Sequence, residues 1–472
     1  MADVPLNARG ASAAEATVQS AAMPATGARA GSWPSATRAW YTLIILTIAF
    51  MFSILDRTIL SLMIEPIKKD LVISDFEVSL LLGPAFVMIY AFSSLPISRI
   101  ADWASRKVIV ASGLAFWSLA TVCCGLAQSY WPLFIARTGV GAGESSFAPA
   151  TYSILADLFP REKLATATGF LSIGYSYGAA IALILGGAVI GLVHNMPNTI
   201  VPGLGVIHPW QWTFIIVGVP GILLALFLQA TVKEPVRQGK FRPKNADGTE
   251  IKSVPVGEVF KFLAADWKCY APIFSSIAIR SLAVGVATWI PSFFVRTYHW
   301  SIPEVGLAQG LILLITTPAG IWIGGLISQR WTRLNMWDCN LRLSVITSVI
   351  ILPTSIFYTL APSPYLALGL MAFNGFVASV GAGPATAALQ LITPNQMRGQ
   401  INSLNLLTFN IFAAAGPSFV AVFTDFVFHK SADLRYSIML VALAINPIAT
   451  FISWLGVKPY GRSVKRAHEE FA

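Results

Sequence analysis

Twelve long apolar segments dominate the sequence and leave few folds open to the chain. Each segment is long enough to cross the hydrocarbon core of a bilayer, which takes about 20 residues of α-helix. Because a backbone in lipid must satisfy its hydrogen bonds internally, we expect every segment to be helical. The predicted spans are residues 40–64, 78–99, 108–127, 132–155, 165–193, 212–232, 270–295, 305–327, 341–360, 365–392, 401–426 and 436–457.

The composition excludes a soluble protein. Hydrophobic residues make up 55% of the chain and charged residues only 11%, whereas soluble domains carry about 25% charged residues. The net charge is +10, but the basic residues lie at the ends of apolar segments and form no stripe for a nucleic acid. Membrane lipid is therefore the expected surrounding. With no nucleophile–base pair and no zinc-like cysteine spacing, we expect no enzyme, metal or cofactor.

The spans divide six and six around a polar stretch, which predicts an all-α integral membrane protein built from two six-helix bundles. Residues 1–37 are predicted to be a disordered cytoplasmic tail, 38–232 the first bundle, 233–268 a cytoplasmic linker, 269–458 the second bundle and 459–472 a cytoplasmic tail. At the linker's end, Val259, Phe260, Leu263 and Trp267 share one helical face. This pattern favours a helix lying on the membrane surface, with a solvated linker as the alternative.

Lys and Arg residues indicate the orientation. They are concentrated in the N-terminal tail, the central linker, the C-terminal tail and the loops on the same side, and they are scarce in the opposite loops. By the positive-inside rule both termini are cytoplasmic. The chain contains no Asn-X-Ser/Thr sequon, which favours a bacterial inner membrane. We expect a monomer.

Charged residues inside the spans are the candidate functional groups, because burying a charge in lipid is costly. Arg137 and Glu144 are seven residues apart, so they lie on one helical face about 10 Å apart along the axis. Counting from the span ends places Asp56 and Arg57 of the first span at a comparable depth. The spacing predicts two acids and two arginines in one pocket if these two helices face each other. The seventh span also contains a charged residue, Arg280.

Buried carboxylates can carry protons, since desolvation and a nearby arginine act on their protonation in opposite directions. The histidines all lie in predicted loops or in the tail, so Asp56 and Glu144 are the candidate proton carriers. A permanent structural ion-pair network is the alternative interpretation.

The loop between the second and third spans carries a family resemblance. Residues 98–107 read Ser-Arg-Ile-Ala-Asp-Trp-Ala-Ser-Arg-Lys, and Asp102, Arg106 and Lys107 match the Gly-x-Leu-x-Asp-Arg-x-Gly-Arg-Arg loop of the major facilitator superfamily. Ser, Trp and Ser replace a Gly, an Arg and a Gly of that signature. An acid and bases at helix ends can hold neighbouring helices in one state, and Asp157 is the expected partner of Arg106. We therefore predict a cytoplasmic gate of Asp102, Arg106, Lys107 and Asp157.

The fourth span resembles the spinster-like branch of this superfamily. Residues 137–150 read Arg-Thr-Gly-Val-Gly-Ala-Gly-Glu-Ser-Ser-Phe-Ala-Pro-Ala, and Asp56-Arg57 is similar to the Asp-Arg pair of that branch's first helix. The resemblance implies the major facilitator fold and transport of lysolipids or sphingosine phosphate. It assigns proton coupling to Asp56 and Glu144, with Arg57 and Arg137 as partners.

Together these features predict a proton-coupled secondary transporter of an amphipathic, lipid-like substrate that works by alternating access. Arg57, Arg137 and Arg280 are the expected contacts of the substrate head group. The polar residues expected to line a cavity in the second bundle are Asn374, Thr386 and Gln390. One alternative is a transporter of a small polar metabolite or drug. An alternative of another class is a non-transporting receptor or a lipid scramblase.

Overall fold

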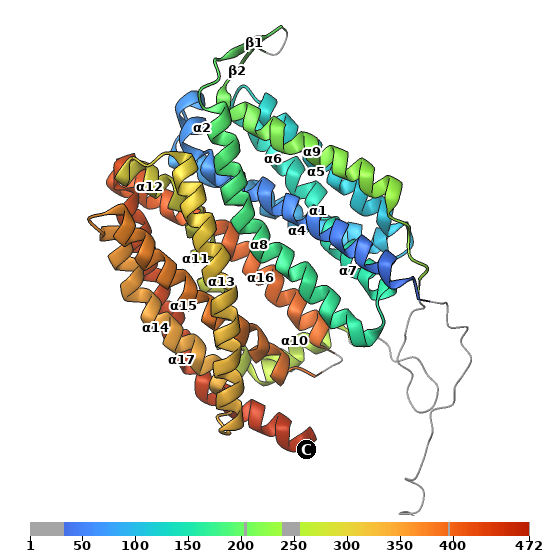
Figure 1. Cartoon of the computed structure of the whole chain (residues 1–472). Helices are drawn as coiled ribbons and strands as arrows, with labels where there is room; N and C mark the ends of the chain where they lie inside the picture. The colour runs from blue at the N-terminus through green and yellow to red at the C-terminus, as the bar shows by residue number, and fades with distance from the viewer. Residues whose placement is uncertain (1–32, 203–204, 238–254, 395–396, 472) are drawn as a thin grey trace, which may run out of the picture.

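A computed structural model describes residues 33–202, 205–237, 255–394 and 397–471, and nearly all of them are helical (Figure 1). Residues 1–32 of the predicted tail lie outside the described residues, whereas Ala36 and Thr37 already belong to the first helix. Residues 238–254 of the predicted linker also lie outside them. The first half contains α1 (Ala36–Leu62), α2 (Ile64–Leu71), α3 (Asp75–Leu82), α4 (Pro84–Ala101), α5 (Arg106–Leu126), α6 (Tyr130–Glu144), α7 (Phe147–Leu158), α8 (Arg161–Val193) and α9 (Pro209–Thr231). A small antiparallel hairpin, β1 (Thr199–Val201) and β2 (Gly205–Ile207), precedes α9 and departs from the all-α prediction.

The second half begins with α10 (Val256–Ala265) and α11 (Trp267–Val286) and ends with a helix longer than its predicted span. The remaining helices are α12 (Ile290–Tyr298), α13 (Ile302–Arg333), α14 (Cys339–Leu360), α15 (Pro364–Ile392), α16 (Arg398–Val422) and α17 (Leu434–Phe471). Since α17 runs on to Phe471, most of the predicted tail continues the last transmembrane helix. We call the end that carries α2, α12 and the hairpin the hairpin end, and the opposite end the termini end (Figure 1).

Eleven helices of the described residues are long and apolar enough to cross a membrane. The fourth predicted span is not among them because it is divided into α6 and α7 at Ser145 and Ser146. Pro149 explains the break, since it has no N–H for the carbonyl of Ser145 and its ring crowds that carbonyl. Counted with α6 and α7 as one span, the described residues contain the twelve predicted transmembrane segments.

Helix α10 packs against the second bundle through some of its apolar side chains. Val259 is buried, and Phe262 and Leu263 pack against the same apolar cluster as Tyr270 of α11. Phe260 and Trp267, on the face predicted to lie on the membrane surface, are more than half exposed. The helix is therefore present where the sequence placed it, but its apolar residues divide between the protein and the outside.

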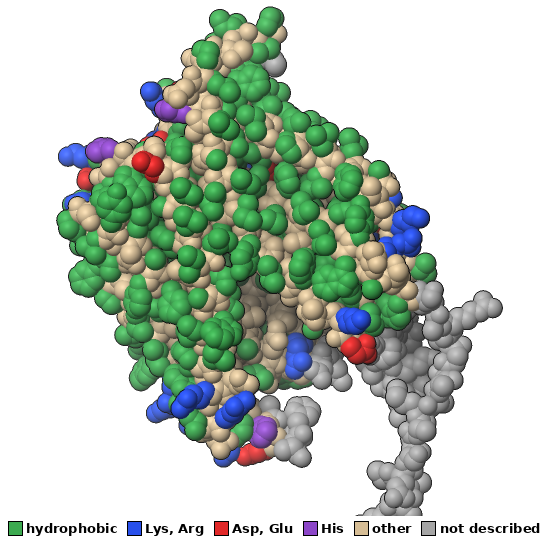
Figure 2. All heavy atoms as spheres, viewed as in Figure 1, with side chains coloured by type: hydrophobic (Ala, Val, Ile, Leu, Met, Phe, Trp, Pro, Cys, Tyr) green, Lys and Arg blue, Asp and Glu red, His purple; other side chains and the backbone are tan. Residues whose placement is uncertain are grey.

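The two bundles approach each other closely where α8 crosses α13 near the hairpin end. A Cβ atom on Gly306 of α13 would lie 2.5 Å from the carbonyl oxygen of Leu183 and 3.1 Å from the Cα atom of Gly187, both in α8. Only glycine permits this backbone contact, since any side chain at either position would hold the two helices apart. Towards the termini end the surface is hollowed between the lower parts of α8 and α13 (Figure 2).

Candidate functional site

The predicted four-charge cluster forms where α1 packs beside α6. Arg57 of α1 donates to a single carboxylate oxygen of Glu144, Oε2, from Nη2 at 2.6 Å and from Nε at 2.8 Å. The hydroxyl of Ser53, one helical turn before Arg57, donates to the same oxygen at 2.6 Å. Glu144 is buried, whereas about a third of the Arg57 side chain is exposed. Arg57 therefore stands between this carboxylate and the accessible surface.

Asp56 and Arg137 are the inner members of the cluster. Arg137 is only 1% exposed and donates from Nη1 to the backbone carbonyl of Asp56 at 3.2 Å. Asp56 is 2% exposed, and among the described residues its Oδ1 has no hydrogen-bond partner and its carboxyl group forms no ion pair. Glu144 Oε1 and Arg137 Nε are likewise unpartnered within the described part of the chain. Among the described residues the site thus holds one ion pair, Arg57–Glu144, beside two buried ionisable side chains that form none.

Aromatic side chains of α4 complete the cluster. The ring of Phe86 lies 4.4 Å from the guanidinium carbon of Arg57 and 5.9 Å from that of Arg137, and Tyr90 lies 5.4 Å from Arg57. Such contacts stabilise a cation through the ring quadrupole. Gly141 of α6 permits the approach, because a Cβ there would lie 3.1 Å from the carbonyl carbon of Phe86. The sequence analysis did not identify Phe86, Tyr90 or Ser53. Such residues are common in transmembrane helices, and the sequence does not show which neighbouring helix they contact.

A second polar cluster lies at the termini end around Arg106, the first residue of α5. Arg106 is 1% exposed and forms an ion pair with Asp157 of α7, as expected from the sequence. It also donates from Nη1 to the carbonyl oxygen and hydroxyl of Ser153, both at 3.0 Å, and from Nε to Glu234 at 2.9 Å. All of these partners belong to the first half of the chain. In this state the cluster therefore holds helices of one bundle together, and its role as a gate stays a prediction.

Glu234, just after α9, is the member of this cluster that the sequence analysis missed. Its carboxylate accepts the backbone N–H of Lys107 at 2.7 Å and the hydroxyl of Ser105 at 2.9 Å, so it caps the start of α5. Burial alone would raise the pKa of Glu234, but the bonds from Lys107, Arg106 and Ser105 hold this pKa below its usual value. The side chain of Asp102 is exposed, and its backbone carbonyl instead accepts a hydrogen bond from Arg237.

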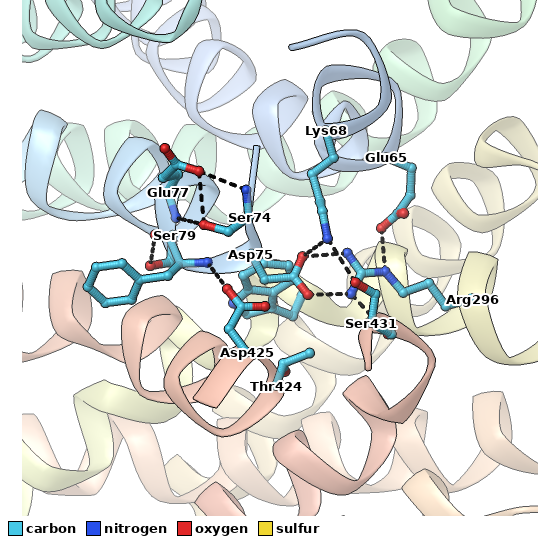
Figure 3. A network of polar contacts seen from close by, with 12 residues as sticks. Glu65, Lys68, Ser74, Asp75, Glu77, Ser79, Arg296, Thr424, Asp425 and Ser431 are labelled. Carbon is cyan, nitrogen blue, oxygen red and sulfur yellow. Dashed lines mark hydrogen bonds and ion pairs between the residues drawn. The ribbon is translucent and has the colours of Figure 1, made fainter. Parts of the chain in front are cut away.

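At the hairpin end a network of ion pairs joins the two bundles (Figure 3). Arg296 of α12 donates to both oxygens of Asp75 in α3, at 2.7 and 2.8 Å, and to Glu65 of α2 at 2.8 Å. Lys68 of α2 pairs with Asp75 at 2.5 Å and donates to the hydroxyl of Ser431, before α17, at 3.1 Å. The Asp75 side chain is fully buried and that of Arg296 is 7% exposed.

A second contact beside this network also crosses between the bundles. Asp425 of the second bundle accepts the backbone N–H of Phe76 at 2.7 Å, and Ser79 shares a hydrogen bond with Ser418 of α16 at 3.0 Å. These contacts hold the hairpin end closed while the termini end is hollowed (Figures 2 and 3). The sequence analysis did not single out any of these residues.

The predicted residues of the second bundle do not form one site. Arg280 of α11 is largely buried and donates to Ser453 of α17 at 2.7 Å, and its Nε has no partner in the described part of the chain. Asn374 of α15 donates to Thr354 and Ser355 of α14 at 2.8 and 3.0 Å, which is helix-packing geometry. Thr386 and Gln390 are exposed on α15. Arg280 is thus the one of these four that presents an unneutralised charge.

Known proteins with similar sequences and structures include transporters. A "MFS-type efflux pump" of Mycolicibacterium smegmatis is 24% identical over 90% of this chain and 94% of its own length. The hexuronate transporter of Escherichia coli K12 is 24% identical over 78% of this chain and 83% of its own, and protein spinster homolog 1 of Xenopus tropicalis is 25% identical over 62% and 55%.

Among solved structures, a bacterial homologue of the human lysosomal transporter spinster, in an inward-facing and unoccupied conformation, superposes with a TM-score of 0.78. It is 23% identical over 91% of this chain and 99% of its own. The family model of the Major Facilitator Superfamily matches residues 46–417, which is most of the chain. With twelve transmembrane segments in two bundles and this match, the chain belongs to the major facilitator superfamily.

Proposed function

We propose that this transporter couples substrate movement to protons through Asp56 and Glu144. The observation that supports the proposal is a pair of buried carboxylates beside two arginines, with only one carboxylate in an ion pair. A charge so deep in the membrane is costly unless it is neutralised, so exchange of a proton there changes which groups can pair. A permanent structural network would instead satisfy every charge in one fixed arrangement.

Arg57 is the coupling element in this mechanism. While Glu144 is ionised, Arg57 is held by it; when Glu144 takes up a proton, the guanidinium is released to bind an anionic group from the accessible side. Arg137 lies behind Asp56 and can neutralise it when Arg57 moves away. Ionised Glu144 and a bound anion then compete for the same cation, so protonation of Glu144 favours anion binding and the two events are coupled.

The structure supports an inward-open state, given the orientation that the Lys and Arg distribution predicts. The termini end then faces the cytoplasm of a bacterium, and the contacts of Arg296 close the periplasmic side. The hollow between α8 and α13 opens on the cytoplasmic side (Figure 2). A monomer contains both bundles and is therefore sufficient for this cycle.

The proposed substrate is an amphipathic anion of the lysolipid or sphingosine-phosphate type. Arg280 supplies a cation with no acid beside it in the described part of the second bundle, which suits an anionic head group. A small polar acid is the second candidate, because the hexuronate and galactarate/D-glucarate transporters are among the similar proteins. Both candidates need the same cations but differ in the apolar tail.

The coupling is tested by uptake into proteoliposomes at several pH values. Asp56→Asn should abolish the pH dependence of uptake while expression is retained, and Asp433→Asn at the hairpin end is the matched control. Unchanged pH dependence in Asp56→Asn would refute the role of this carboxylate.

Substrate class is tested by counterflow with a panel of lysolipids, hexuronates and other organic acids, with and without a pH gradient. Lysolipid counterflow that hexuronates do not inhibit supports the amphipathic substrate, and the reverse supports the polar acid. Binding without flux would indicate a receptor, and lipid movement indifferent to the gradient would indicate a scramblase.

A further inference from the structure

A groove at the termini end lies between α17 and the start of α14, far along the chain from the charge cluster. It consists of two adjoining pockets with volumes of about 440 and 390 Å³. The two pockets share Asp338, Arg342, Val457 and Lys458, so they form one continuous groove. Helix α14 contacts α13, α15 and α17 of its own bundle, which places this groove on the flank of the molecule.

One part of the groove is strongly basic. Its cationic lining residues are Arg342, Lys458, Arg462 and Lys465. Arg342 pairs with Asp338 at 2.6 Å, and Lys465 pairs loosely with Glu469 at 3.7 Å, both in exposed positions where ion pairs contribute little. Within the described part of the chain Lys458 and Arg462 form no ion pair. The groove therefore carries an excess of positive charge around a single acid.

The other part of the groove is apolar and continues towards the bilayer. It is lined by Val345 and Ile346 of α14 and by Trp454 and Leu455 of α17. Ile346 follows Arg342 by one helical turn, and Trp454 precedes Lys458 by one turn, so both helices place a cation about 6 Å above an exposed apolar side chain. Figure 2 shows Lys and Arg side chains gathered at this end directly beside hydrophobic surface.

We propose that this groove binds an anionic phospholipid of the surrounding membrane. The phosphate would contact Lys458 and Arg462, and the acyl chains would lie along Ile346, Trp454 and Leu455. The basic and apolar parts match a charged head group and its chains in both chemistry and order along the helices, and basic pockets between transmembrane helices suit such head groups. The proposal does not depend on the transported substrate, because the groove and the charge cluster lie in different bundles.

Native mass spectrometry of the full chain in detergent tests this site. Phosphatidylglycerol and phosphatidylcholine with the same acyl chains are titrated against the wild type and the variant Lys458→Gln/Arg462→Gln. The matched control is Lys163→Gln/Lys268→Gln, which removes two exposed positive charges from the same end outside the groove. Glycerol phosphate, which has the charge but no chains, is added as a competitor.

The wild type should bind phosphatidylglycerol more tightly than phosphatidylcholine. The groove variant should lose about 25-fold of its phosphatidylglycerol affinity, since each of the two charges contributes about fivefold. The control variant should keep the preference, and glycerol phosphate should not compete at equal concentration. An unchanged preference in the groove variant, or an equal loss in the control, would overturn the proposal. Competition by glycerol phosphate would indicate a site for soluble phosphate compounds instead. The substituted side chains are exposed, so folding should be retained, and either single substitution serves if the double variant unfolds.

Discussion

Replacing Arg296 with glutamine should open the hairpin end of the transporter. The side chain makes two hydrogen bonds to the buried Asp75 and one to Glu65, and it is itself 7% exposed. Breaking a buried ion pair by removing one partner costs about 3–5 kcal/mol, and Lys68 remains to neutralise Asp75, so we expect the lower end, about 3 kcal/mol. These bonds exist only while the bundles touch, so the population ratio should shift towards the opened state by about 150-fold.

Distances between spin labels measure this shift. Val72, between α2 and α3, and Tyr365, at the start of α15, are 88% and 76% exposed at the hairpin end and belong to different bundles. The native cysteines are replaced and cysteines for spin labelling are introduced at these two positions. Double electron–electron resonance should then show a population at longer distances in Arg296→Gln than in the otherwise native sequence. Lys69→Gln, an exposed charge change on α2, is the control. Equal distance distributions in both variants would refute the conclusion that the Arg296 contacts stabilise closure.

Three further substitutions test other parts of the structure. Glu234→Gln should lower the free energy of unfolding at neutral pH by about 1 kcal/mol, after discounting for its partial exposure, as thermal unfolding would show. Because the pKa of Glu234 is depressed, its contribution is present above the unfolded pKa and lost as the pH falls through the folded pKa, so variant and wild type should converge in acid. Gly141→Val should push α6 away from Phe86 at a cost of about 1–3 kcal/mol, whereas Gly169→Val, with open space beside it, should be tolerated. Arg280→Gln should raise the KM for an anionic substrate in uptake assays without moving the pH midpoint, with partial rescue by Arg280→Lys.

A specific outcome would contradict each of these three predictions. A stability difference for Glu234→Gln that is constant with pH would show that the carboxylate charge does not hold the cap. Equal unfolding temperatures for Gly141→Val and Gly169→Val would contradict the close approach of α6 and α4. A shifted pH midpoint in Arg280→Gln would place that residue in proton coupling rather than in substrate binding.

Segment length and charge spacing predicted most of the architecture. The twelve spans follow from hydrocarbon thickness, and the seven-residue interval from Arg137 to Glu144 placed both side chains beside the first helix. The partner assignment within the cluster could not be predicted, because spacing alone does not decide whether Glu144 or Asp56 receives Arg57. The break at Ser145 was missed for a different reason, since Pro149 lies inside an otherwise continuous apolar segment.

The Arg296 network was invisible in the sequence for a physical reason. Its acids and bases lie in short connections near span ends, where charged residues are expected in any membrane protein. Their function depends on which loops of the two bundles meet in space, and that is a property of the packing. Glu234 was missed on similar grounds, because a glutamate after a span resembles any other polar linker residue.

The glycine contact between α8 and α13 lies near one end of α8, where a pivot would amplify movement at the other end. Gly187 lies 26 residues from the start of α8, which corresponds to a lever arm of about 39 Å. If the bundles tilt about this fulcrum, each degree of rotation displaces the far end of α8 by about 0.7 Å while the glycine backbones scarcely slide. A small change at the short arm, such as the loss of a few ion pairs, is thereby magnified into a wide movement at the opposite mouth.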